Sequence, residues 1–101
     1  MTTRDYVYVG DVIQACLAAA DSPANDVVNI GTGQQTSTAQ LLELVETALG
    51  ASTEHLAQPD VQDEVKHCAL AIDKARKLLN WAPTMQLKYG ITETVNWYRA
   101  L

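Results

Sequence analysis

The stretch RDYVYVGDVIQACLAAADSPANDVVNIGTG, residues 4–33, decides the fold class. Residues 4–9 are rich in aromatic and β-branched side chains, which favour a β-strand, and a glycine ends the run. Apolar residues then recur at helical spacing over residues 12–20 until an Asp-Ser-Pro sequence stops them. Residues 26–30 are a second apolar run, which a glycine turn closes. A strand, a helix and a strand in so few residues predict a βαβ unit with a short parallel strand pair.

Downstream of this unit the sequence predicts three more helices. Ser37 and Gln40 have the spacing of a capping box, and the leucine-rich stripe that follows ends at Gly50, a helix-terminating position. Asp11 and Gln14 have the same capping spacing at the start of the first helix. The other two helices are expected over residues 72–79, opened by Asp73, and 87–100. The expected class is therefore α+β, with a parallel strand pair and about four helices.

Two segments between these helices have weaker patterns. Residues 54–57 are expected to form a short strand, and residues 58–65 an acidic loop around Pro59. Neither segment changes the fold class. The 101 residues suffice for a single domain, residues 1–101.

The charge is distributed unevenly along the chain, whose formal net charge is −5. Arg4 is the only Lys or Arg in residues 1–65, whereas residues 66–101 contain six. An acidic majority argues against a nucleic-acid partner, because phosphates would be repelled over most of the surface. No apolar run reaches the length of a membrane span, and the first residues do not have the pattern of a signal peptide, so we expect a cytoplasmic protein.

The residue pattern contains no catalytic set and no metal site. His55, His67 and Cys68 do not have the spacing of metal ligands, nor do the acids at 60, 63 and 64. Cys16 and Cys68 form no C-x-x-C motif, so we expect two reduced, buried thiols. The Gly31-Thr32-Gly33 turn lacks the third glycine of a dinucleotide fingerprint, because Thr36 stands at that position. We therefore expect no cofactor at this turn.

Arg4 and Asn29 are the candidate ligand-binding residues. A guanidinium suits bidentate recognition of phosphate, and Arg4 lies at the start of a predicted strand near Asn29 of the next. The alternative for Arg4 is a surface ion pair with Asp5, Asp26 or Asp63. The alternative for Asn29 is a structural hydrogen bond that closes a turn.

Several blocks resemble the carboxy-terminal third of the NAD-dependent epimerase/dehydratases, the extended short-chain dehydrogenases that act on nucleotide sugars, such as UDP-glucose 4-epimerase. The resemblance runs nearly end to end and follows the family's order. Its blocks are Arg4-Asp5-Tyr6-Val7-Tyr8-Val9 with Asp11-Val12, Val28-Asn29-Ile30-Gly31-Thr32-Gly33, Thr36-Ser37, Leu41-Leu42-Glu43-Leu44, Ile72-Asp73-Lys74-Ala75-Arg76-Lys77-Leu78-Leu79-Asn80-Trp81 and Gly90-Ile91 to Trp97-Tyr98-Arg99.

The resemblance implies a nucleotide-sugar-binding domain in which Arg4 contacts the substrate diphosphate and Asn29 lines the nucleotide site. The family's NAD turn, its catalytic Ser/Thr and its Tyr-x-x-x-Lys pair have no counterpart in these residues, so no catalytic or cofactor-binding residue is assigned. NAD is expected only in full-length members of the family. The chain alone should therefore be inactive.

The sequence departs from the family pattern at three places. Val61-Gln62-Asp63-Glu64 stands where the family has an R-P-G-D block, whose arginine is a second diphosphate ligand. Ala71 replaces an aspartate, and Gln86 replaces a helix-capping Ser or Thr. The acidic pair opposes a diphosphate, so any binding of a nucleotide diphosphate should be weak.

Two functions remain open. The chain is either a detached substrate-binding domain of a nucleotide-sugar epimerase/dehydratase or a stand-alone interaction or oligomerisation module that keeps only the fold. The first predicted strand and helix are apolar on nearly all sides, so we expect another protein surface to bury them. We expect either a homodimer or a partner chain that carries the cofactor domain.

Overall fold

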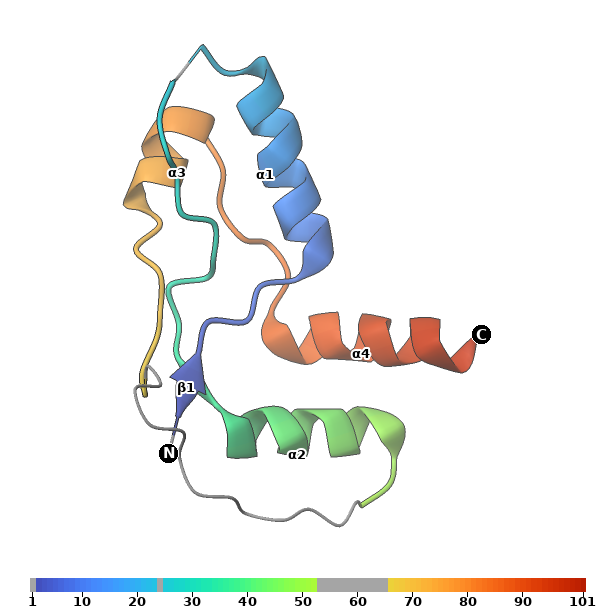
Figure 1. Cartoon of the computed structure of the whole chain (residues 1–101). Coiled ribbons are helices and arrows are strands. Elements are labelled where there is room, and N and C mark those ends of the chain that lie inside the picture. Colours follow the sequence, from blue (N-terminus) through green and yellow to red (C-terminus); the bar gives the residue numbers. More distant parts are fainter. Residues whose placement is uncertain (1, 24, 53–65) are drawn as a thin grey trace.

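The computed structural model describes residues 2–23, 25–52 and 66–101. In these residues it contains a two-stranded sheet and four helices (Figure 1). This content confirms the expected α+β class with four helices. The strands are β1 (Thr3–Arg4) and β2 (Thr36–Ser37), and the helices are α1 (Val9–Asp21), α2 (Thr38–Leu49), α3 (Asp73–Leu79) and α4 (Leu87–Arg99).

The helices are arranged as two pairs, α1 beside α3 and α2 along α4 (Figure 1). Extended segments join the two pairs. The small sheet lies beside the amino-terminal end of α2. Long stretches of chain therefore run through the middle of the molecule without belonging to a helix or a strand.

The core lies between α1, α3 and the loop that follows α3. Ala15, Ala75 and Trp81 are buried there, and three half-buried side chains pack against them: Val28, Ile30 and Leu79. The indole Nε1 of Trp81 donates to the carbonyl of Asp11 at 2.9 Å. Two alanines at the helix contact let α1 and α3 approach closely, and Trp81 fills the space below them.

The sheet is the main correction to the sequence analysis. Only Thr3 and Arg4 of the amino-terminal run form a strand, and β1 pairs antiparallel with β2, with Thr3 opposite Ser37 and Arg4 opposite Thr36. Residues 26–30 are not a strand, so the expected parallel pair is wrong. The side chains of Val28 and Ile30 pack against the core. The backbone of residues 26–30 makes no strand pairing with residues 4–9.

The start of the first helix is the second correction. Helix α1 begins at Val9, with Tyr8 as its N-cap, so Asp11 lies inside the first turn and is not the cap. Asp11 is 5% exposed. Its carboxylate accepts from the amides of Thr84 and Met85 at 3.1 and 3.0 Å and from Thr84 Oγ1 at 2.8 Å. Asp11 therefore fastens the loop before α4 to α1.

The remaining helix predictions are confirmed in substance. The capping box of α2 has both of its hydrogen bonds, Gln40 N to Ser37 Oγ at 3.1 Å and Ser37 N to Gln40 Oε1 at 2.9 Å. Gly50 ends α2 in the left-handed region at φ 69°. Helices α3 and α4 match their expected ranges within one residue at each end, and the N-cap Gln86 makes no side-chain capping bond. The short strand at 54–57 and the acidic loop at 58–65 lie outside the described residues.

Candidate functional site

Arg4 lies in β1, half buried, at the end of the molecule where the sheet joins the extended segments (Figure 1). Its Nη1 donates to the carbonyl of Thr3 at 2.8 Å, so the guanidinium folds back along its own strand. Of the alternative acids named above, Asp26 pairs with Lys74 at 3.0 Å, and Asp5 accepts hydrogen bonds from other segments. The residues on either side of Arg4 in the chain hold its backbone in place.

Asp5 is the most connected of these neighbours. Its carboxylate accepts from Thr32 N at 2.9 Å, Thr32 Oγ1 at 2.6 Å, Gly33 N at 2.9 Å and Leu70 N at 3.0 Å. One side chain thus joins three segments that are far apart in the sequence. We call Thr3, Asp5, Thr32, Gly33 and Leu70 the polar junction.

The environment of Asp5 favours its ionised form. Burial raises the pKa of the carboxyl, but the hydrogen bonds from Leu70, Thr32 and Gly33 together outweigh it and bring the pKa below its ordinary value. Asp5 is therefore held as a carboxylate, and the charge strengthens each of these hydrogen bonds.

The glycine turn has a role that its sequence did not reveal. The Thr32 and Gly33 amides, the groups that a bound phosphate would need, donate to the Asp5 carboxylate. Gly31 is buried beneath it, and a Cβ there would lie 2.8 Å from Asp5 Oδ2 and 3.0 Å from Leu70 Cδ1. The turn thus needs its first glycine because Asp5 approaches it closely. This contact explains why a glycine stands at position 31.

Asn29 precedes Gly31 by two residues on the segment that leads into the polar junction, and its side chain is exposed. Among the described residues no hydrogen bond joins Asn29 to Arg4. The two candidate residues therefore belong to neighbouring segments, which Asp5 ties together through Thr32 and Gly33.

A polar hollow of about 320 Å³ lies near β2 and the start of α4. Tyr6 and Thr36 contribute to it from the strand side, and Gln86 and Lys88 from the helix side. Neither Arg4 nor Asn29 is among its lining residues. The described residues that line it are Tyr6, Thr32, Gln34, Thr36, Pro83, Thr84, Met85, Gln86, Leu87 and Lys88.

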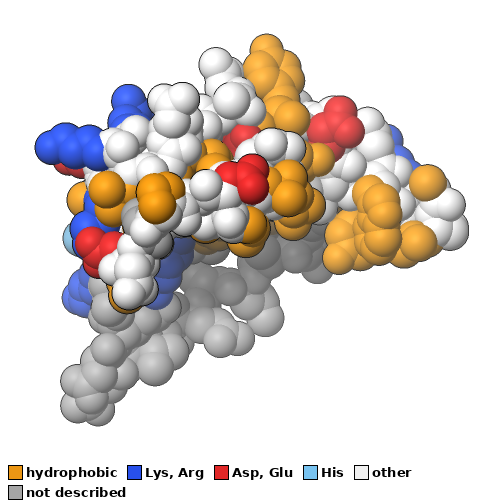
Figure 2. All heavy atoms as spheres, turned by 90° about the horizontal axis from the view of Figure 1, so that it is seen from above, with side chains coloured by type: hydrophobic (Ala, Val, Ile, Leu, Met, Phe, Trp, Pro, Cys, Tyr) orange, Lys and Arg blue, Asp and Glu red, His pale blue; other side chains and the backbone are white. Residues whose placement is uncertain are grey.

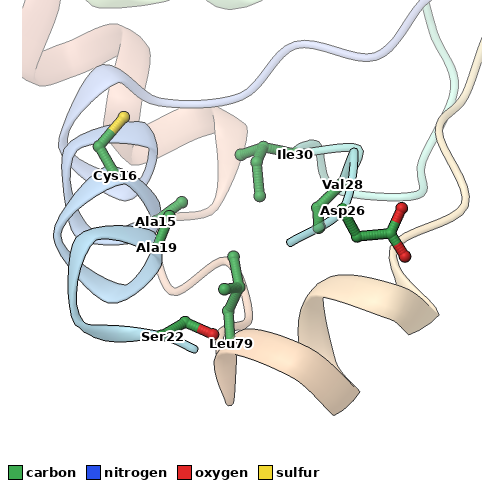
Figure 3. A pocket seen from close by; sticks show the side chains of 8 residues that line it. All are labelled: Ala15, Cys16, Ala19, Ser22, Asp26, Val28, Ile30 and Leu79. Atoms are coloured by element: carbon green, nitrogen blue, oxygen red, sulfur yellow. The ribbon is translucent and has the colours of Figure 1, made fainter. Parts of the chain in front are cut away.

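A second, mostly apolar hollow of about 240 Å³ separates α1 from residues 26–30 (Figure 3). Cys16 of α1 lines it and is exposed, while Cys68 is half buried, and both are free thiols. The expectation that both thiols are buried is wrong. Figure 3 shows the lining side chains, which are Ala15, Cys16, Ala19, Ser22, Asp26, Val28, Ile30 and Leu79.

The outer side of α1 is apolar and exposed. Val9, Ile13 and Leu17 recur at four-residue spacing and are 63%, 52% and 58% exposed. We call these three residues the apolar face of α1. Figure 2 shows hydrophobic side chains at several separate places on the face that is seen from above. Trp97 and Tyr98, near the carboxy-terminal end of α4, are also exposed.

Two further features bear on the class of protein. Within residues 2–23, 25–52 and 66–101, no three His, Cys, Asp or Glu side chains come together as metal ligands would. His55 and the acids at 60, 63 and 64 lie outside these ranges. No helix in the same ranges is long and apolar enough to cross a membrane.

Two comparisons, one with curated proteins and one with solved structures, indicate the same family. No protein-family model matches the chain. It is 41% identical over 97 residues to an inferred UDP-glucose 4-epimerase of Methanocaldococcus jannaschii and 36% identical over 98 residues to the UDP-glucose 4-epimerase of Mycolicibacterium smegmatis. Each match covers 96% of this chain and 31% of the relative.

Solved structures give the same result. The chain superposes on the UDP-glucose 4-epimerase of Thermotoga maritima, solved with UDP-glucose, with a TM-score of 0.91 at 37% identity over 98% of this chain. It superposes on the UDP-glucuronic acid 4-epimerase of Bacillus cereus, in complex with UDP-glucuronic acid and NAD, with a TM-score of 0.88 at 29% identity. The chain corresponds to the carboxy-terminal portion of the NAD-dependent epimerase/dehydratase family. It spans about a third of the length of these epimerases.

Proposed function

We propose that the chain is the nucleotide-sugar-binding portion of an epimerase or dehydratase, in which Arg4 contacts the nucleotide diphosphate and Asn29 lines the nucleotide site. The observation that carries the proposal is the anchoring of Arg4. The strand pairing and the Asp5 carboxylate fix the backbone on both sides of the one basic residue in the first 65. A fixed guanidinium binds a phosphate with a smaller loss of side-chain entropy than a mobile one.

The superposition on an epimerase solved with UDP-glucose supports the same substrate class. UDP or a UDP-sugar should bind weakly, at high micromolar concentration or above, because Asp63 and Glu64 replace a basic block of the family. The chain alone should carry out no hydride transfer, because its sequence has no Tyr-x-x-x-Lys pair. NAD and the catalytic groups would then belong to the other portion of the family's members.

Amide shift mapping with UDP tests the substrate site. We expect shifts near Arg4 and Asn29 in the native chain and a loss of affinity of roughly tenfold or more in Arg4→Ala, because a charge-assisted contact is removed. Arg76→Ala, which removes an exposed arginine of α3, is the matched control and should bind as the native chain does. Equal shifts in native and Arg4→Ala chains contradict the assignment.

A titration with NAD or NADP tests the cofactor proposal. We expect no measurable binding, since the Thr32 and Gly33 amides already donate to Asp5. Micromolar affinity in isothermal titration would show that the chain carries a cofactor site of its own.

The apolar face of α1 favours a second function, that of an association module. Three large apolar side chains on one side of a helix, each more than half exposed, are typical of an interface. We propose that the chain covers this face by forming a homodimer, or by binding a chain that carries the cofactor domain. Sedimentation equilibrium over a tenfold concentration range tests self-association, and a mass fixed at 11.0 kDa throughout contradicts the homodimer.

A further inference from the structure

The hydroxyl group of Thr3, the residue before Arg4, makes contacts that no strand ladder requires. Thr3 Oγ1 donates to Gln35 Oε1 at 2.8 Å and accepts from Cys68 N at 3.3 Å. His67 Nδ1 lies 3.3 Å from the same oxygen. In addition, Thr3 N donates to the carbonyl of Lys66 at 2.6 Å. Thr3 thus contacts one segment just before β2 and another that is more than 60 residues away.

The hydrogen atoms of this network can be assigned. A hydroxyl has one hydrogen to donate and two lone pairs that accept. The hydrogen of Thr3 is directed to Gln35 Oε1, and the amide of Cys68 occupies one lone pair. His67 must therefore donate to the second lone pair, which places a hydrogen on its Nδ1. In this arrangement the Thr3 hydroxyl is fully satisfied.

The network lies beside the residue proposed to bind the diphosphate. Arg4 Nη1 donates to the carbonyl of Thr3. The guanidinium therefore contacts the backbone of Thr3, and the network holds the side chain of the same residue. Asp5 makes the corresponding contacts on the other side of Arg4, to Thr32, Gly33 and Leu70. Thr3 and Asp5 are two apart in an extended stretch, so their side chains share one face and Arg4 lies on the other.

We propose that Thr3 is a positioning residue for Arg4, which fixes the guanidinium for a nucleoside diphosphate by holding β1 between residues 35 and 66–68. This inference rests on the proposed function of Arg4. The Thr3 hydroxyl does not touch the ligand itself. Its loss leaves the charge of Arg4 in place but lets β1 move, so it weakens binding without abolishing it.

The test compares Thr3→Val with Thr3→Ser in the 101-residue chain. Valine keeps the shape and removes the hydroxyl, whereas serine keeps the hydroxyl. We expect UDP to bind about fivefold more weakly to Thr3→Val, which removes the three hydrogen bonds of the hydroxyl but keeps the charge of Arg4. Thr3→Ser should stay within about twofold of the native affinity. The affinities are measured by amide shift titration, and uridine without phosphates should show no difference between the two variants.

Long-range proton–nitrogen spectra of the His67 ring supply a second measurement, independent of ligand. The native chain and Thr3→Ser should show a proton on Nδ1, and Thr3→Val should lose this preference. Gln35→Leu, at an exposed position, removes only the acceptor of the Thr3 hydrogen and serves if Thr3→Val does not fold. It should weaken UDP binding about twofold to threefold.

The outcomes separate this inference from the function on which it rests. If UDP binding depends on Arg4 but is equal in native and Thr3→Val chains, the positioning role is wrong and the proposed function stands. If the native chain does not bind UDP, or binds it independently of Arg4, both are wrong. A His67 ring that carries its proton on Nε2 in the native chain contradicts the assigned network and with it the positioning role.

Discussion

The polar junction and the apolar face of α1 differ in whether their side chains find partners within the described residues. In the junction, Asp5 engages four donors and Thr3 engages Gln35 and Cys68, so extended segments are held firmly without a ladder of strand hydrogen bonds. On α1, Val9, Ile13 and Leu17 are each more than half exposed. The difference teaches that the polar groups beside the proposed binding site find their partners within this chain, whereas the apolar side chains of α1 remain exposed.

Loss of the Asp5 charge should have the largest effect on this comparison. In Asp5→Asn the side chain keeps one oxygen that accepts hydrogen bonds. Its NH2 group, a donor, then faces backbone amides that are donors too. We expect the free energy of unfolding to fall by about 3 kcal/mol, as for lost hydrogen bonds to a partly buried charge. Urea denaturation measures the change, and Asp21→Asn, at an exposed position at the end of α1, is the control. A change below about 1 kcal/mol would show that the junction is not held by its carboxylate.

The next largest effect is expected at Gly31. In Gly31→Ala the added Cβ would lie 2.8 Å from Asp5 Oδ2 and 3.0 to 3.1 Å from Leu70, so Asp5 must withdraw from the turn. The free energy of unfolding should fall by about 2 kcal/mol, a usual value for overpacking a buried position. Thermal and urea unfolding both report this change. In the double variant with Asp5→Asn the two losses should be less than additive, since both act on one contact.

Acid should weaken the junction to a smaller extent, because protonation leaves the shape of the side chain intact. Burial raises the pKa of Asp5 and of Asp11, but in each case hydrogen bonds outweigh it and lower the pKa below its ordinary value. A lowered folded pKa contributes stability that is present above the unfolded value and is lost as the pH falls through the folded value. Unfolding free energies should therefore decline below about pH 4 and decline less in Asp5→Asn. Equal slopes in the two proteins contradict this role of Asp5.

The smallest change in stability is expected on the apolar face of α1. Leu17→Glu places a charge where 58% of the side chain is exposed, so the monomer should change by less than about 0.5 kcal/mol. The same substitution should abolish self-association in sedimentation equilibrium. Gln14→Glu adds the same charge at an exposed polar position of α1 and should leave association unchanged. Identical masses for native and Leu17→Glu chains at every concentration contradict an interface on this face.

The sequence predicted the helices well and the sheet poorly, for a physical reason. Helix signals are local: the Ser37 and Gln40 capping box and the terminating Gly50 lie within one helix, and the structure confirms both. Strand signals depend on a partner, which neighbouring residues do not specify. Residues 26–30 have the composition of a strand, yet Val27 is 82% exposed and the segment pairs with no strand in the described residues.

The sequence names Arg4 as a candidate residue but does not predict the contacts that hold the backbone around it. Arg4 stood out as a lone basic residue beside β-forming residues, and the family blocks around it were correctly recognised. The roles of Asp5 and Thr3 were not foreseen, because their partners Leu70 and Cys68 are each 65 residues away. The capping spacing of Asp11 was misleading for the same reason, since its partners are Thr84 and Met85.

The separation between Asp5 and Leu70 also sets the order in which the chain can fold. Closing a loop of 65 residues costs more entropy than forming a helix turn, so contacts of this kind arise after the local ones. During synthesis, α1 and α2 can form before Leu70, a partner of Asp5, has been made. The strand that carries Arg4 thus reaches its fixed position later than α1 and α2, although it precedes both in the sequence.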